Sequence, residues 1–140
     1  MWFNPIICGV LRSPLHGLLS KHMLVLSYTG RRSGKVYTIP VDYIRDGEQF
    51  WLMSSPERTW WRNLQGGAQV ALLLKREIMH ATATAYPNDR VATRAGISAT
   101  MREMPQVARI LLGKLPPDQP LADEQIDTLM QRRVMINVVP

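Results

Sequence analysis

The fold is decided by residues 36–53, whose sequence is VYTIPVDYIRDGEQFWLM. Apolar and polar residues alternate over 36–44, as expected of a strand with one buried face. Asp46-Gly47 is a typical hairpin turn, and residues 49–53 then form a returning strand. Pro40 cannot donate a hydrogen bond to a neighbouring strand, so it predicts an edge position or a bulge. The stretch therefore predicts an antiparallel hairpin.

Further strands are expected on either side of this hairpin. Residues 23–28 and 134–139 are apolar enough for buried strands, and 134–139 suits a central or dimer-facing position. Residues 68–74 and 78–85 form a second hairpin that turns at Lys75-Arg76. Helical patterns occupy a short stretch opened by Ser55 and Pro56 and closed by Gly66-Gly67, residues 88–113 divided at Pro105, and residues 123–133.

About six strands joined by short turns, with helices at the periphery, predict an α+β fold built on a small antiparallel barrel. The 140 residues are expected to form a single domain, 1–140, in which 87–133 are peripheral helices or a helical insertion. Residues 1–22 are expected to form a helical lid. Asn4-Pro5 is a typical helix start, and the apolar residues between 6 and 19 fall largely on one stripe. Such a helix covers one mouth of a barrel or lies on a membrane surface, and its weakly basic polar face favours the lid.

The charge balance favours an anionic partner, because 17 Lys and Arg stand against 11 Asp and Glu, a formal charge of +6. Nucleic acid is not expected, since the basic residues are dispersed and form no run of five. The single Cys8 excludes an intrachain disulfide and a multi-cysteine metal site. The three histidines lack metal-ligand spacing, so no metal is expected. Without a signal-peptide pattern or a membrane-spanning run, a cytoplasmic location is expected.

A basic, glycine-bracketed loop connects two of the expected strands. It has the sequence TGRRSG over residues 29–34. Gly30 and Gly34 let backbone N–H groups approach a ligand closely, and Arg31 and Arg32 offer planar forks of donors for phosphate or carboxylate. The order of residues is neither that of a Walker loop nor that of a dinucleotide fingerprint. The loop is thus either an anion site or a solvated basic turn.

The chain resembles the deazaflavin-dependent nitroreductase family over residues 5–86. The resemblance is carried by LSYTGRRSGK at 26–35, TIPV at 38–41, the turn at Asp46-Gly47 and WWRNL at 60–64, in that order. The family belongs to the split β-barrel flavin and deazaflavin oxidoreductases, which are related in fold to pyridoxamine-phosphate oxidases. The resemblance implies binding of a reduced deazaflavin, coenzyme F-420, and hydride transfer to a small electrophile such as a quinone or a nitro compound.

The resemblance also assigns roles to individual residues. It implies that the loop residues Gly30, Arg31, Arg32, Ser33 and Gly34 hold the coenzyme's phosphodiester. It places Trp60 and Asn63 near the deazaflavin ring and gives Pro40 as a further coenzyme-binding residue. The chain departs from many relatives in its short loop before Trp60 and in having Tyr37 where they carry arginine. FMN is therefore the alternative coenzyme.

The remaining candidates have a functional and a structural interpretation. Tyr37 and Tyr43 can supply a proton to a reduced acceptor, or they can be packing residues of a strand. Ser54 and Ser55 can donate to a ring carbonyl, or Ser55 can cap a helix. No nucleophile–base pair is visible, which fits an enzyme whose coenzyme carries the chemistry and equally fits a non-catalytic carrier of a lipid or other apolar ligand. The expected partners are a small electrophilic substrate and, as further options, a homodimer and a weak membrane contact through the first helix.

Overall fold

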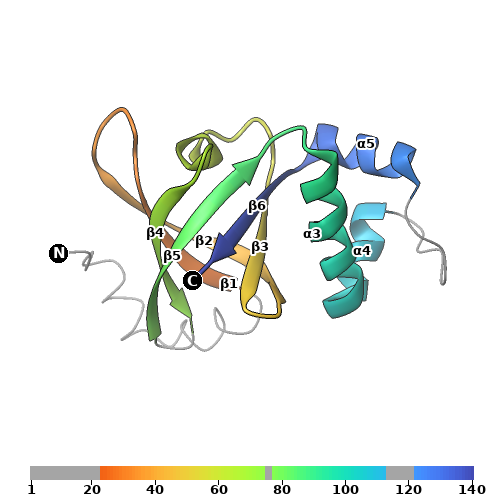
Figure 1. The fold of residues 1–140 in the computed structure, drawn as a ribbon, viewed down its shortest axis with the longest axis horizontal. Helices are drawn as coiled ribbons and strands as arrows, with labels where there is room; N and C mark the ends of the chain where they lie inside the picture. Colours follow the sequence, from red (N-terminus) through yellow and green to blue (C-terminus); the bar gives the residue numbers. More distant parts are fainter. Residues whose placement is uncertain (1–22, 75–76, 113–121) are drawn as a thin grey trace.

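The computed structural model of the chain describes residues 23–74, 77–112 and 122–140. The lid expected at 1–22 and the turn expected at 75–76 lie outside these ranges. The described residues form six strands and four helical segments (Figure 1). In chain order these are β1 (Met23–Thr29), β2 (Val36–Asp46), β3 (Gln49–Ser54), the 3-10 helix η1 (Trp60–Leu64), β4 (Ala68–Leu74), β5 (Glu77–Tyr86), α3 (Arg90–Glu103), α4 (Pro105–Leu112), α5 (Asp123–Arg132) and β6 (Val134–Val139).

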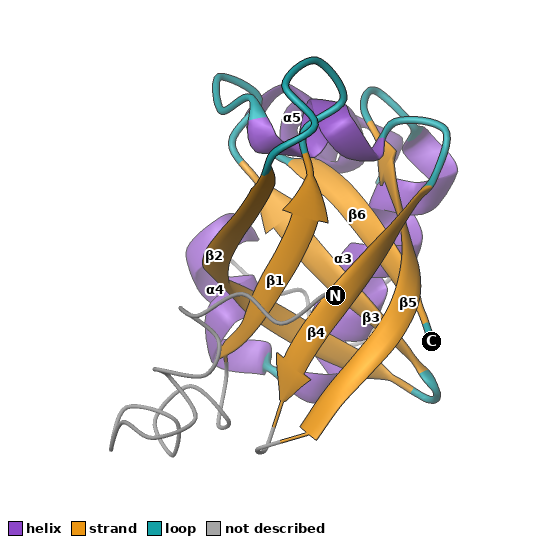
Figure 2. Ribbon diagram, turned by 90° about the vertical axis from the view of Figure 1, so that its left-hand side faces the viewer, coloured by secondary structure: helices purple, strands orange, loops and turns teal. Residues whose placement is uncertain are grey.

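The six strands close into one barrel in the order β1-β2-β3-β6-β5-β4, and every neighbouring pair is antiparallel. The helices lie outside it, with α3 and α4 along one flank (Figures 1 and 2). The predicted α+β barrel with peripheral helices is therefore confirmed. The expected central position of residues 134–139 is confirmed too, because β6 lies between β3 and β5.

The core has two layers that follow from the two-residue period of the strands. Inward side chains such as Leu26, Leu52 and Ile136 are fully buried and fill the barrel. Outward side chains of β3 and β6, Trp51 and Met135, are buried as well, under α3. Strands β3 and β6 are therefore apolar on both faces, which explains their continuous runs of hydrophobic residues.

Strand β2 changes partner along its length, and this opens the barrel. Residues 36–42 pair with β1, whereas residues 43–46 pair with β3. Strand β3 continues beside β6 as far as Ser54, so β2 and β3 diverge. Within the described ranges, the part of β2 that contains Pro40 is paired on one side only, so the predicted edge position is confirmed. The divergence is the opening of a split barrel.

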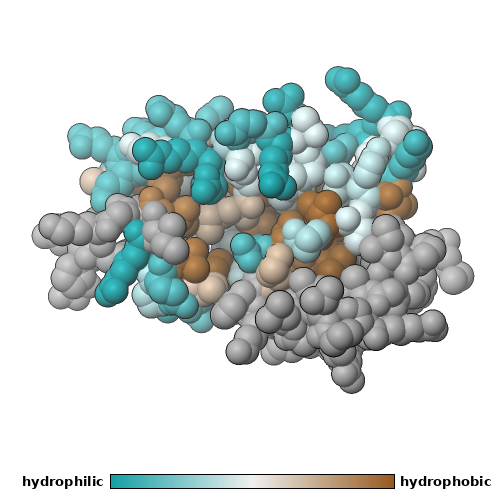
Figure 3. Space-filling model, turned by 180° about the vertical axis from the view of Figure 1, so that it is seen from behind, coloured by the Kyte–Doolittle hydropathy of each residue, from teal (hydrophilic) through white to brown (hydrophobic). Residues whose placement is uncertain are grey.

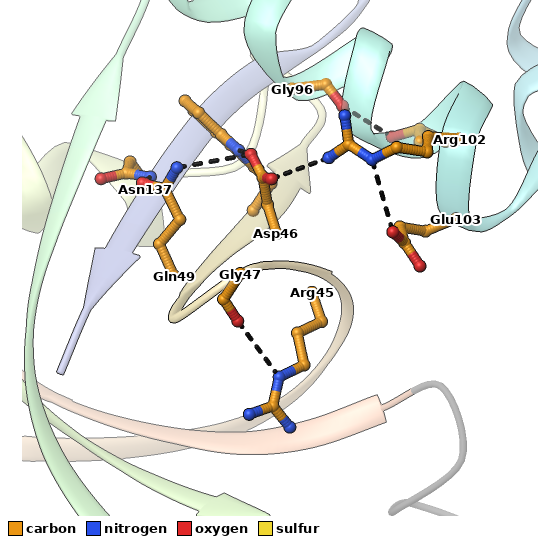
Figure 4. Close-up of polar contacts among 10 residues, drawn as sticks. Arg45, Asp46, Gly47, Gln49, Gly96, Arg102, Glu103 and Asn137 are labelled. Atoms are coloured by element: carbon orange, nitrogen blue, oxygen red, sulfur yellow. Dashed lines mark hydrogen bonds and ion pairs between the residues drawn. The ribbon is translucent and has the colours of Figure 1, made fainter.

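Helix α3 is fixed to the barrel by close packing and by one carboxylate. A Cβ atom on Gly96 would lie 1.8 Å from Cε of Met135, so glycine allows this close approach. Asp46, at the end of β2, accepts hydrogen bonds from Trp51 Nε1 at 3.1 Å and from Arg102 Nη2 at 2.7 Å (Figure 4). One side chain thus joins the hairpin turn, the buried indole and the C-terminal end of α3.

We expect Asp46→Ala to lower the free energy of unfolding by about 1–3 kcal/mol, because it leaves the buried Trp51 N–H without its acceptor. Urea denaturation measures the change. Glu48→Ala is the matched control, since Glu48 lies on the same turn and is exposed. Equal, small effects in both variants would show that the carboxylate does not hold α3.

Two local predictions for the helices have different outcomes. The helical pattern over 88–113 does divide at Pro105, giving α3, which is capped by Asp89, and α4. The short helix does not begin at Ser55 and Pro56; that prediction is wrong. Instead the N–H of Arg58 donates to the carbonyl of Ser55 in a turn, and η1 starts at Trp60 without a side-chain cap. Its start is set by burial of Trp60, Trp61 and Leu64.

None of the helices in the described part of the chain is long and apolar enough to cross a bilayer.

Candidate functional site

A cavity of about 700 Å³ lies where β2 and β3 diverge, and α4 forms its outer wall. Figure 2 shows β2 and α4 on the same side of the barrel, and Figure 3, seen from behind, shows apolar side chains across the middle of that face beneath a hydrophilic rim. The lining residues are Met23, Ile39, Pro40, Val41, Asp42, Tyr43, Ile44, Trp51, Met53, Ser54, Ser55, Arg58, Trp60, Met104, Val107, Leu111 and Arg133. Its size and mostly apolar wall are typical of small-molecule and cofactor sites.

A few polar groups face this apolar wall. Tyr43 is partly buried, and burial raises the pKa of its phenol, although the charge of Arg45 acts in the opposite direction. The phenol is therefore protonated at neutral pH and can act as a hydrogen-bond donor. Ser54 is buried and donates from Oγ to the carbonyl of Ser55 at 3.1 Å, so it is oriented by the backbone.

Three aromatic rings connect the cavity with the basic loop. Trp60 lines the cavity and its ring centroid lies 6.4 Å from that of Tyr28. Tyr28 in turn stacks on Tyr37, with centroids 5.6 Å apart. The hydroxyl of Tyr37 shares a 3.2 Å hydrogen bond with Ser33 of the loop. Burial, and secondly the neighbouring Tyr37, raises the pKa of Tyr28. The adjacent Trp61 is not in the cavity wall but in the barrel core.

The loop itself is held in one conformation by short-range hydrogen bonds. The N–H of Gly30 donates to the carbonyl of Lys35 at 2.8 Å, and the N–H of Gly34 donates to the carbonyl of Gly30 at 2.9 Å. Gly34 has a φ of 70°, which favours glycine. A Cβ atom on Gly30 would lie 2.8 Å from both Ser33 Oγ and Tyr37 Cε2. Both glycines are thus required by the loop's own geometry.

The two arginines of the loop differ in what they contact. Arg31 donates from Nη2 to the carbonyl of Gln65 and, at 3.4 Å, to that of Gly67, beyond the end of η1. Its backbone N–H donates to Asn63 Oδ1 at 3.0 Å. Arg32, by contrast, is exposed, and the described residues offer its guanidinium no hydrogen bond or ion pair. Arg31 therefore clamps the loop to η1, whereas Arg32 is available to an anion.

Asn63 belongs to the same clamp. Besides accepting from Arg31, it donates from Nδ2 to the carbonyl of Trp60 at 3.1 Å. Both ends of its amide are thus engaged in positioning the loop against η1. Asn63 is not one of the residues that line the cavity, so these contacts do not support its predicted place near the ring.

The predicted site residues therefore fall into two groups joined by the aromatic row. Pro40, Tyr43, Ser54, Ser55 and Trp60 line the cavity. The loop group consists of Gly30, Arg31, Arg32, Ser33, Gly34, Tyr37 and Asn63. Among the described residues, no three His, Cys, Asp or Glu side chains are grouped so that they could hold a metal.

Sequence reasoning missed several residues of the cavity wall. Arg58 and Arg133 bring positive charge to it, and α4 contributes the apolar side chains of Val107 and Leu111. These residues are far apart in the chain and belong to no recognisable motif. Among these elements only α4 could be predicted from neighbouring residues, because its apolar side chains form a stripe. The stripe does not indicate which surface of the barrel the helix covers.

The geometry defines a split-barrel protein with a ligand cavity at the opening of the barrel. The F420H(2)-dependent quinone reductase family matches residues 13–106, and the chain belongs to this family. No curated protein matches the chain in sequence.

Several solved structures share the fold. The heme storage protein HutZ from Vibrio cholerae is 15% identical, with a TM-score of 0.58 and coverage of 100% of this chain and 91% of the other. An F420-H2 dependent reductase (FDR-A) is 13% identical, with a TM-score of 0.53 and coverage of 84% and 94%. A putative pyridoxamine 5'-phosphate oxidase from Listeria innocua is 12% identical, with a TM-score of 0.53 and coverage of 97% and 91%. At these identities the likeness concerns the fold.

Proposed function

We propose that the chain binds a reduced deazaflavin, coenzyme F-420, and catalyses its oxidation by a small quinone or nitro compound. The observation that carries the proposal is the cavity at the barrel opening, joined through Trp60, Tyr28 and Tyr37 to an exposed basic loop. Membership of the quinone reductase family supports the same chemistry.

The residues present fit the two parts of such a coenzyme. The mostly apolar wall, with Trp60 and Pro40, suits a planar tricyclic ring. The loop suits the anionic tail, because Arg32 and Lys35 are exposed cations on a backbone held in a fixed conformation. When bound, the reduced deazaflavin supplies a hydride.

The protein's own residues orient the reactants and move one proton. Reduction of a quinone to a hydroquinone takes up a hydride and a proton, and the protonated phenol of Tyr43 at the cavity wall would donate that proton and regain it from water. The apolar wall contributed by α4 limits the access of water to the acceptor. Tyr37 lies outside the cavity wall and instead supports the loop, so we assign the proton to Tyr43. A cytoplasmic location and a homodimer stay predictions.

The two loop arginines should respond differently to substitution. Arg32→Ala is expected to weaken coenzyme binding about tenfold, the effect of one lost charge-assisted contact, and to leave unfolding unchanged. Arg31→Ala is expected to weaken binding and also to lower the free energy of unfolding by about 1 kcal/mol, because it frees the loop from η1. Coenzyme titration and urea denaturation of both variants measure the two effects. Loss of stability in Arg32→Ala, or intact affinity in both variants, would contradict the assignment.

Parallel titrations test the choice of coenzyme. The protein is titrated with the deazaflavin coenzyme and with FMN, and binding is followed by the fluorescence of each compound. We expect the deazaflavin to bind at least about tenfold more tightly, since its tail adds charges for the basic loop. Tighter binding of FMN would favour the FMN-dependent alternative. Binding of neither compound would favour the carrier of an apolar ligand.

A further inference from the structure

Two arginines from distant parts of the chain line the cavity. Arg58 lies in the turn between β3 and η1, and Arg133 lies between α5 and β6. Arg133 donates from Nη1 to the carbonyl of Arg132 at 2.8 Å, which leaves its other guanidinium donors for a ligand. The described residues offer the Arg58 guanidinium no hydrogen bond or ion pair.

The charge of the cavity wall is therefore positive. Among the described residues its ionisable groups are Arg58, Arg133, Asp42 and Tyr43; the phenol of Tyr43 is neutral at pH 7, and burial raises its pKa further. Two cations against one carboxylate favour an anionic group in the ligand. None of the described ion pairs joins Asp42 to either arginine. Neither arginine is therefore neutralised by a partner in the wall.

The rest of the cavity wall favours a ligand with an apolar body. Met53, Met104, Val107 and Leu111 all belong to the lining, and none of them offers a strong hydrogen-bonding side chain. Methionine side chains adapt their shape to a ligand, so this part of the wall accepts a planar or a linear apolar group. Arg58 is exposed and Arg133 is partly buried, so a neutral ligand would leave both guanidinium groups to water, whereas an anionic ligand would form charge-assisted hydrogen bonds with them.

The geometry points to an amphipathic anion as the ligand of this cavity: an acidic electron acceptor, with its apolar body against α4 and its carboxylate, sulfonate or phosphate between Arg58 and Arg133. The proposed function is needed only for the statement that this anion is the acceptor. The anion site itself stands on the cavity and its charge.

The site is tested by binding, without coenzyme, of two fluorescent probes that share an apolar body. These are 1-anilinonaphthalene-8-sulfonate, which is an anion, and N-phenyl-1-naphthylamine, which is neutral. Arg58→Gln and Arg133→Gln are each expected to weaken binding of the sulfonate about tenfold, the effect of one lost charge-assisted contact. Binding of the neutral probe should stay within about twofold. Arg132→Gln is the matched control, since Arg132 is exposed and is not part of the cavity wall.

Two results would overturn the anion site. One is unchanged sulfonate binding in both variants; the other is a parallel loss of both probes, which would mean that the variants damage the apolar wall. A further arm identifies the source of the anion. The variants are titrated with the full deazaflavin coenzyme and with the deazariboflavin that lacks the phosphodiester and glutamates.

An acidic acceptor predicts that the variants keep their affinity for both deazaflavins. It also predicts that 1,4-naphthoquinone-2-sulfonate displaces the anionic probe from the wild type more effectively than menadione, which has a methyl group in place of the sulfonate. Selective loss of the full coenzyme in the variants would assign the arginines to the coenzyme tail and overturn the acceptor assignment. The probe experiment measures binding without turnover, so it tests the anion site even if the proposed enzymatic reaction is not observed.

Discussion

Replacing Trp60 by leucine is expected to lower kcat/KM for deazaflavin-dependent quinone reduction by about 10²-fold, because misplacing a reacting ring by about 1 Å has an effect of that size. Trp60 makes two contacts: it lines the cavity, and its ring lies near that of Tyr28 in the aromatic row. Leucine keeps an apolar side chain there but removes the flat surface. The initial rate of coenzyme oxidation with menadione measures the effect.

Trp61→Leu is the matched control for this experiment. The two tryptophans are adjacent and similarly buried, with 8% of Trp60 and 7% of Trp61 exposed, but Trp61 belongs to the barrel core alone. Both variants should therefore lose stability, by up to about 3 kcal/mol. Only Trp60→Leu should lose turnover at a temperature where both are folded. An equal loss of turnover in both variants would mean that η1 has only a structural role, and it would contradict the placement of Trp60 at the coenzyme ring.

Replacing Tyr43 by phenylalanine is expected to lower kcat by about 10²–10⁴-fold, the range for a lost general acid, with little change in KM. The raised pKa of Tyr43 fixes the pH dependence of the wild type. The phenol donates while it is protonated, so its contribution stays constant through neutral pH and declines only above the ordinary tyrosine value of 10.0. In Tyr43→Phe this alkaline decline should be absent.

Tyr37→Phe separates the chemical role of Tyr43 from a general effect of losing a hydroxyl. Tyr37 bonds to Ser33 in the loop and does not line the cavity, so its loss should raise the coenzyme Kd and leave kcat unchanged. The pH–rate profiles and coenzyme titrations of both variants give the comparison. A normal kcat in Tyr43→Phe would contradict the role of Tyr43 as proton donor. It would favour a packing role instead, since the Tyr43 ring packs edge-on against that of Phe50.

The barrel was predictable from the sequence because its determinants are local. The alternation over 36–44, the turn at Asp46-Gly47 and the apolar run of β6 each specify one strand from neighbouring residues. Pro40 also predicted an edge position, and it lies in the part of β2 that pairs with β1 but not with β3. The start of η1 was not predictable in this way, because burial of Trp60 and Trp61 overrides the helix-start signal at Ser55 and Pro56.

The site was predictable only in part, because its contacts connect distant residues. The loop motif predicted an anion site but not the different contacts of Arg31 and Arg32, since the partners of Arg31 lie more than 30 residues further along the chain. The cavity depends on α4 and on Arg133, which meet β2 only in the folded barrel. No spacing in the sequence brings these residues together.

The central claim, that the chain uses a reduced deazaflavin to reduce a small electrophile, is tested most directly by multiple-turnover oxidation of the reduced coenzyme. Protein, an excess of reduced deazaflavin and menadione or a nitroaromatic are mixed, and the absorbance of the oxidised deazaflavin is followed against a blank without protein. The account predicts many turnovers per protein molecule. Tight binding of the coenzyme without oxidation by either acceptor would contradict the claim and favour a carrier.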